Sequence, residues 1–118
     1  MGEAQPQHIE MYVTPDDRVP FEEWLLALRD ARARARIRVR IDRLSLGNPG
    51  DAHPVGAGVS ELRIDYGPGY RIYFAQSGPI TLLLLWGGDK GTQAADIRKA
   101  QDYWVEYQRR RREHDEAH

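Results

Sequence analysis

Basic side chains recur in three consecutive segments that have the pattern of strands. Arg63 alternates with apolar residues within segment 60–66, Arg71 does so within 70–75, and Lys90 follows a third, apolar segment. Short turns rich in glycine and proline separate these segments, so we expect the strands to be neighbours in one sheet. Two arginines and a lysine on a concave sheet face are suited to bind a phosphodiester and to stabilise the extra negative charge of its transition state.

Acidic and aromatic side chains accompany this basic cluster. The period-two alternation places Glu61 and Asp65 on the side of Arg63, Tyr73 on the side of Arg71, and Asp89 directly before the lysine. The same pattern has a second interpretation, in which the arginines merely pair with Glu61 and Asp65 across a solvated sheet face. The spacing alone does not decide between an anion-binding site and such pairing.

The histidines give a weaker signal. His53 lies in a segment expected to be a loop, outside the terminal segments that contain the other three histidines. A histidine there could act as a general acid or base near neutral pH, but the sequence favours an exposed loop side chain before Pro54. The chain has no cysteine and no metal-ligand spacing, so we expect neither a metal nor another cofactor.

Length and composition limit the classes of protein. The chain has 118 residues, which predicts one domain over 1–118, with a charged tail from about residue 109. Its 17 basic and 18 acidic residues give a formal charge of −1, which argues against nucleic-acid binding through the net field alone. No segment has the pattern of a membrane span or a secretory signal, so we expect a cytoplasmic protein.

Hydrophobic periodicity predicts an α+β fold of the order β-α-α-β-β-β-α. We expect the last three strands to be antiparallel and the first strand to add at an edge of a small twisted sheet. We further expect the helices, a helical hairpin and a C-terminal helix, to pack on one side of the sheet and to leave the other side partly open. The strands are predicted at 8–13, 60–66, 70–75 and 80–86, and the helices at 20–30, 32–46 and 92–109.

The second predicted helix carries arginines along one edge, including Arg36, Arg40 and Arg43. Such an edge could contact a partner protein or nucleic-acid phosphates, or could form ion pairs within the chain with acids such as Asp42. For a helix this rich in arginine, we rank partner or intramolecular contacts above contact with RNA.

Three motifs in order carry a resemblance to a known family. They are ELR at 61–63, GPGYR at 67–71, and GGDK at 87–90 followed by Gln93 and by DI at 96–97. Over about residues 13–107 the chain resembles the addiction-module killer proteins, the HigB-like branch of the RelE/ParE toxin superfamily. The resemblance implies a RelE-like fold and the toxin role in a type II toxin–antitoxin system. Most such toxins cleave mRNA without a metal, usually on the ribosome.

The resemblance also implies roles for individual residues. Arg63 and Arg71 would hold and neutralise the phosphate, and Lys90 would contact it or donate a proton to the leaving oxygen. Asp89 would orient a neighbouring group, and His53, which stands where this branch often has a lysine, would be the general base. The substrate-binding set would be Arg63, Arg71, Tyr73 and Lys90.

The partners implied are a cognate helix-turn-helix antitoxin, mRNA on the ribosome, and a toxin–antitoxin hetero-oligomer. Arg36, Arg40 and Arg43 are the residues that we expect to contact the antitoxin. The alternative is a protein without catalytic activity that binds DNA gyrase or another protein target, as in the ParE branch. The near-neutral charge favours this alternative, because toxins directed at RNA are commonly more basic.

Overall fold

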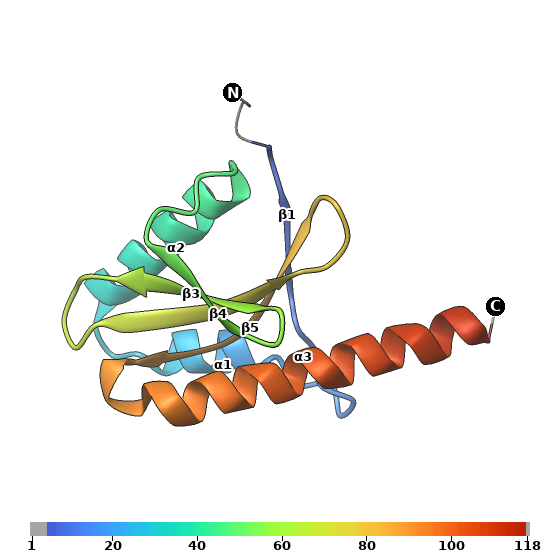
Figure 1. The fold of residues 1–118 in the computed structure, drawn as a ribbon. Coiled ribbons are helices and arrows are strands. Elements are labelled where there is room, and N and C mark those ends of the chain that lie inside the picture. The colour runs from blue at the N-terminus through green and yellow to red at the C-terminus, as the bar shows by residue number, and fades with distance from the viewer. Residues whose placement is uncertain (1–4, 118) are drawn as a thin grey trace.

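The computed structural model describes residues 5–117 and contains one five-stranded mixed sheet with helices on both faces (Figure 1). The strand order is β1-β5-β4-β3-β2, with β1 parallel to β5 and every other pair antiparallel. The α+β class, the antiparallel run of the last three strands and the edge position of the first strand are therefore confirmed. The elements are β1 (His8–Met11), α1 (Pro20–Ala27), α2 (Ala31–Ser45), β2 (Ala52–Gly56), β3 (Val59–Ile64), β4 (Tyr70–Gln76), β5 (Thr81–Asp89), the short 3-10 helix η1 (Lys90–Thr92) and α3 (Gln93–Glu116).

Local signals explain where the first two helices begin. Pro20 occupies the first turn of α1, followed by Glu22 and Glu23, which suit the positive end of the helix dipole. Asp30 caps α2, because its side chain accepts hydrogen bonds from the backbone N–H groups of Arg32 and Ala33. The break expected near residue 30 is thus the start of the second helix.

Two elements differ most from the sequence prediction, although α1 also ends earlier than expected, at Ala27, and β5 later, at Asp89. The segment Ala52–Gly56, expected to be a loop, forms edge strand β2 and pairs with β3. Pro54 and Gly56 obscured the strand pattern in the sequence, but an edge strand tolerates both residue types. The register of the β2–β3 pairing shifts between these two residues. Helix α3 continues to Glu116 instead of ending near Arg109, because the charged residues there are good helix formers without a glycine or proline among them.

The prediction that all helices lie on one side of the sheet is also wrong. Ile72 and Leu84 face a core formed with α1 and α2, whereas Tyr73 and Leu85 face a second core formed with α3. Because both faces are covered, β5 is apolar at nearly every position, as its interior place in the sheet requires. The C-terminal end of α3 extends beyond the sheet (Figure 1).

Two consecutive glycines at the end of β5 let both helical layers approach the strand. A Cβ at Gly87 would lie 2.2 Å from the ring of Trp24 on α1, and a Cβ at Gly88 would lie 1.9 Å from Asp96 Oδ2 on α3. Asp96 accepts hydrogen bonds from the indole of Trp86, at 2.8 Å, and from the hydroxyl of Thr92. These contacts hold the first turn of α3 against the end of β5.

Within residues 5–117, no helix has the length and apolar character needed to cross a membrane.

Substituting Gly87 by alanine is expected to lower the free energy of unfolding by about 2 kcal/mol, because the new methyl group overlaps the Trp24 ring. Chemical denaturation measures the change. Gly91→Ala is the control, since the nearest atom to its added Cβ is a single side-chain oxygen at 3.2 Å. Equal stability of the two variants would contradict the close approach of α1 to β5.

Candidate anion-binding site

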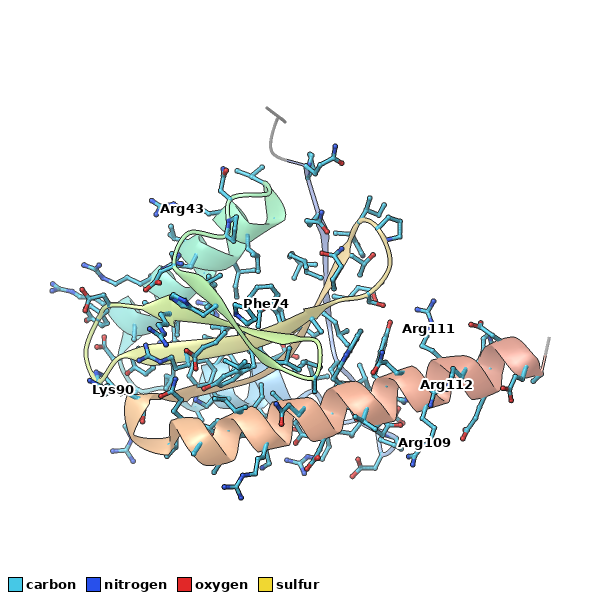
Figure 2. All side chains as sticks on the ribbon, in the orientation of Figure 1. Arg43, Phe74, Lys90, Arg109, Arg111 and Arg112 are labelled. Carbon is cyan, nitrogen blue, oxygen red and sulfur yellow. The ribbon has the colours of Figure 1, made fainter. Side chains whose placement is uncertain are left out.

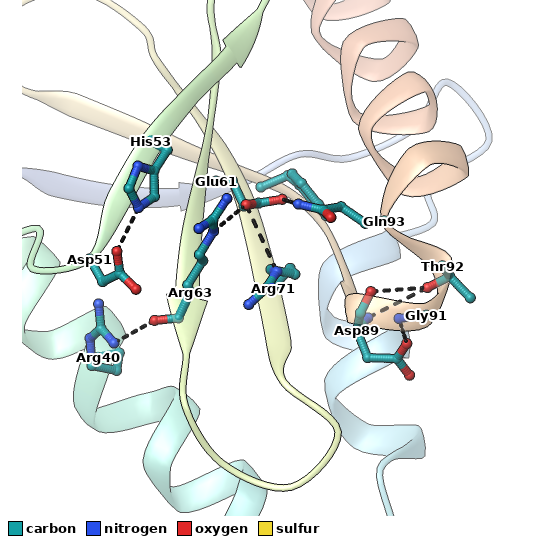
Figure 3. A network of polar contacts seen from close by, with 11 residues as sticks. Arg40, Asp51, His53, Glu61, Arg63, Arg71, Asp89, Gly91, Thr92 and Gln93 are labelled. Carbon is teal, nitrogen blue, oxygen red and sulfur yellow. Dashed lines mark hydrogen bonds and ion pairs between the residues drawn. The ribbon is translucent and has the colours of Figure 1, made fainter.

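Two arginines lie directly opposite each other on neighbouring strands. Arg63 of β3 is the cross-strand partner of Arg71 of β4, on the sheet face that α3 covers in part. Like charges at such a position repel each other and destabilise the sheet. Glu61, two residues before Arg63, supplies the counter-charge: its Oε1 lies 2.8 Å from Arg63 Nε and 3.8 Å from Arg71 Nε (Figure 3).

Glu61 is fully buried, and both of its oxygens have partners. Oε2 accepts hydrogen bonds from Gln93 Nε2 at 2.7 Å and from the hydroxyl of Tyr73 at 3.1 Å. Burial acts to raise the pKa of Glu61, but hydrogen bonds from Arg63, Gln93 and Tyr73 outweigh it and leave the pKa below its ordinary value. The carboxylate is therefore ionised at neutral pH and joins β3, β4 and α3 at one point.

The arginines keep donors that Glu61 does not use. Arg63 donates to Glu61 through Nε alone, and Arg71 Nε is buried without a hydrogen bond among residues 5–117. The Arg63 side chain is 40% exposed and that of Arg71 is 11% exposed. With their Nε atoms turned toward one carboxylate, the two guanidinium groups retain the paired Nη donors that bind phosphate or carboxylate in a bidentate manner.

Lys90 lies beside this pair because of the turn between β3 and β4. The backbone N–H of Lys90 donates to the carbonyl of Gly69 at 2.9 Å, and a Cβ at Gly69 would lie 3.5 Å from Lys90 Cβ and 3.9 Å from Arg71 Nη1. Gly69 has a φ of +83°, which favours glycine at this position. Lys90 itself is exposed at the corner between β5 and α3 (Figure 2).

The other residues predicted for the site surround it in different ways. Asp89 uses its carboxylate to accept the backbone N–H of Gly91 at 2.8 Å and so shapes η1 beside Lys90. Tyr73 is fully buried, with its hydroxyl bound to Glu61. His53 is exposed on β2 as the cross-strand partner of Glu61, and its Nε2 lies 2.6 Å from Asp51 Oδ1. This hydrogen bond with His53 is the largest cause of the lowered pKa of Asp51.

Two of the three α2 arginines predicted to contact an antitoxin have partners other than the acids considered from the sequence. Arg40 donates to the carbonyl of Arg63 at 2.7 Å (Figure 3) and to that of Pro49 at 3.2 Å. The guanidinium of Arg36 lies over the ring of Tyr66, at 4.6 Å from its centre. Among residues 5–117, no carboxylate forms an ion pair with Arg36, Arg40 or Arg43. Ion pairing with Asp42, which was one of the alternatives for this helix edge, is thus absent within residues 5–117.

Three residues organise the site in ways that the sequence did not predict. Glu61 was expected only as a possible ion-pair partner, Gln93 only as part of a motif, and Arg40 only as part of the helix edge that contacts an antitoxin. The alternation in segment 60–66 placed Glu61 on the side of Arg63, but no sequence pattern shows that α3 buries this carboxylate. Within residues 5–117, no group of three or more His, Cys, Asp or Glu residues is arranged to hold a metal ion.

The fold and site define a small α+β protein in which a buried carboxylate holds two arginines on a mixed sheet. No model of a known protein family matches the chain. An uncharacterized protein of Haemophilus influenzae is 49% identical over 80 residues, which are 68% of this chain and 81% of that relative. The chain belongs to the same family as this Haemophilus protein.

Substituting Glu61 by glutamine is expected to lower the free energy of unfolding by about 3 kcal/mol at pH 7, because Arg63 and Arg71 lose their buried counter-charge. Because the folded-state pKa of Glu61 is lowered, its contribution is complete above the unfolded pKa of about 4.3 and disappears as pH falls through the folded pKa. Denaturant unfolding at several pH values tests this.

The difference in stability between the wild type and Glu61→Gln should therefore shrink below about pH 4. Glu113→Gln, at an exposed position on α3 without a side-chain hydrogen bond or ion pair within residues 5–117, serves as the control and should change stability little. A difference that stays the same at pH 7 and pH 3 would show that the charge of Glu61 is not what matters.

Proposed function

We propose that the protein is the toxin of a type II toxin–antitoxin system, a HigB-like member of the RelE/ParE superfamily with a RelE-like fold. In this proposal it is a cytoplasmic, metal-independent, ribosome-associated mRNA endonuclease that a cognate antitoxin neutralises. The observation that carries the proposal is the Arg63–Arg71 pair. The buried carboxylate of Glu61 faces the Nε atoms of both arginines, and their Nη donors have no partner within residues 5–117. The motifs ELR, GPGYR and GGDK supply these residues in order.

The proposed reaction is attack of the ribose 2′-hydroxyl on the adjacent phosphorus. The new bond from the 2′ oxygen closes a cyclic phosphate, and the bond to the 5′ oxygen breaks and leaves a free 5′-hydroxyl. Arg63 and Arg71 would bind the non-bridging oxygens and stabilise the charge that develops on them. His53, with Asp51 at one ring nitrogen, would take the proton of the 2′-hydroxyl, and Lys90 would give a proton to the leaving oxygen.

The ribosome has a physical role in this proposal. With a formal charge of −1, the chain attracts RNA weakly at long range, so binding depends on a few local contacts. A ribosome that already holds the mRNA in an extended path would present one phosphodiester to the site and reduce the entropy lost on binding.

The second candidate is an inhibitor without catalytic activity that binds DNA gyrase or another protein target. The near-neutral charge favours it, because a surface that docks on a protein does not need an excess of basic residues. Under this alternative, Arg63 and Arg71 would bind carboxylates of the target.

Substituting Arg71 or Lys90 by alanine is expected to reduce mRNA cleavage in cells by about 10²-fold, because each change removes a donor to the reacting phosphate. Mapping the 5′ ends of mRNA after induced expression measures cleavage. Arg38→Ala is the matched control, since Arg38 is exposed on α2 and has no hydrogen bond or ion pair within residues 5–117.

Growth arrest that persists in the Arg71 and Lys90 variants, without new 5′ ends in the wild type, would refute the nuclease. Replication arrest with DNA breaks linked to gyrase would instead support the second candidate.

A further inference from the structure

Helix α2 has a second face that no other element within residues 5–117 covers. Its inner face, which includes Ala33, Ile37 and Leu44, is buried in the core, whereas Val39 is 47% exposed. Next to the exposed face is a groove of about 370 Å³. The residues that line this α2 groove are Ala35, Arg36, Val39, Arg40, Arg43 and Ile64.

The α2 groove combines an apolar floor with a basic rim. Ala35, Val39 and Ile64 supply the floor, and Arg36, Arg40 and Arg43 supply three positive charges without a carboxylate partner among residues 5–117. The three arginines are four and then three residues apart, so they follow one edge of the helix at intervals of about one turn. Figure 2 shows Arg43 at the outer side of α2.

This combination favours one class of occupant. Three unneutralised guanidinium groups call for several negative charges with the same spacing, and the apolar floor calls for an apolar side chain between them. The backbone of RNA offers the charges but no aliphatic anchor for Val39. An acidic amphipathic helix offers both, because residues three and four apart lie on one of its faces.

We propose that the α2 groove binds an acidic, amphipathic segment of a partner protein, with carboxylates on Arg36, Arg40 and Arg43 and an apolar side chain against Val39. The inference rests on the proposed function in one respect, that the partner is the antitoxin. The groove reaches one strand of the candidate site, because Arg40 donates to the carbonyl of Arg63 and Ile64 is the next residue along β3. A bound segment would thus lie beside β3, on the sheet face opposite the Arg63 side chain.

The test uses the full chain and a defined probe. The probe is a capped helical peptide with glutamates at positions i, i+4 and i+7 around one leucine, and the matched control peptide has glutamines instead. Binding is measured by fluorescence anisotropy for the wild type, Arg43→Glu and Arg38→Glu, with circular dichroism to show that each variant is folded. Arg38→Glu makes the same charge change on the same helix, outside the groove.

The expected result is that Arg43→Glu weakens binding of the acidic peptide by about tenfold or more, whereas Arg38→Glu changes it less than twofold. Amide NMR shifts in the wild type should then centre on Ala35, Val39 and Ile64. Absence of peptide binding by the wild type, or equal loss in both variants, would overturn the proposal. Loss of single-stranded RNA binding in Arg43→Glu, with peptide binding unchanged, would overturn it in favour of an RNA surface.

Cleavage of mRNA by the wild type, measured in parallel, separates this proposal from the proposed function. Peptide binding without cleavage would support the proposal for the α2 groove and refute the nuclease. Cleavage without peptide binding would support the nuclease and refute the proposal for the α2 groove.

Discussion

The buried carboxylate of Glu61 is the interaction on which the candidate site depends. Arg63 and Arg71 face each other across two strands, an arrangement that repulsion would otherwise open. Glu61 neutralises part of this charge and turns both Nε atoms toward one point. The Nη groups have no protein partner within residues 5–117, and two such guanidinium groups on neighbouring strands suit an anion that accepts paired hydrogen bonds, such as phosphate.

The corner between β5 and α3 is built around the same carboxylate. Gly87 and Gly88 let α1 and α3 approach the strand, Asp96 binds the indole of Trp86, and Gln93 then reaches Glu61. The motif at 87–97 is thus explained largely by packing and by hydrogen bonds that position other groups. Lys90 is the residue of this motif that is both exposed and beside Arg71. One short segment therefore serves the fold and the candidate site together.

The sequence predicted the parts that repeat regularly. Alternation in β3 and β4 placed Arg63 and Arg71 on one face, and the continuous apolar run identified β5 as an interior strand. The sequence did not predict β2, because a proline and a glycine obscure the pattern of this edge strand. It also did not predict which face of the sheet α3 covers, because this depends on the path of the chain between β5 and the helix. A charged tail was expected from about residue 109, although the residues from 109 to 116 favour a helix and form the end of α3.

The two interpretations of the arginines from the sequence, ion pairing and anion binding, concern different atoms of the same side chains: the Nε atoms face Glu61, and the Nη donors are available for the predicted anion. Glu61 accepts a hydrogen bond from Nε of Arg63 and forms an ion pair with Nε of Arg71. Asp65 forms no ion pair within residues 5–117. Spacing could not separate these interpretations, because the burial of Glu61 depends on Gln93 and Tyr73 from other elements.

We propose that the paired arginines act on an RNA phosphodiester, and this is tested by incubating the purified chain with ribosomes programmed with a defined mRNA and analysing the fragment termini. The expected fragments end in a 2′,3′-cyclic phosphate or begin with a 5′-hydroxyl. Intact mRNA, or fragments that carry a 5′-phosphate, would refute the proposed reaction.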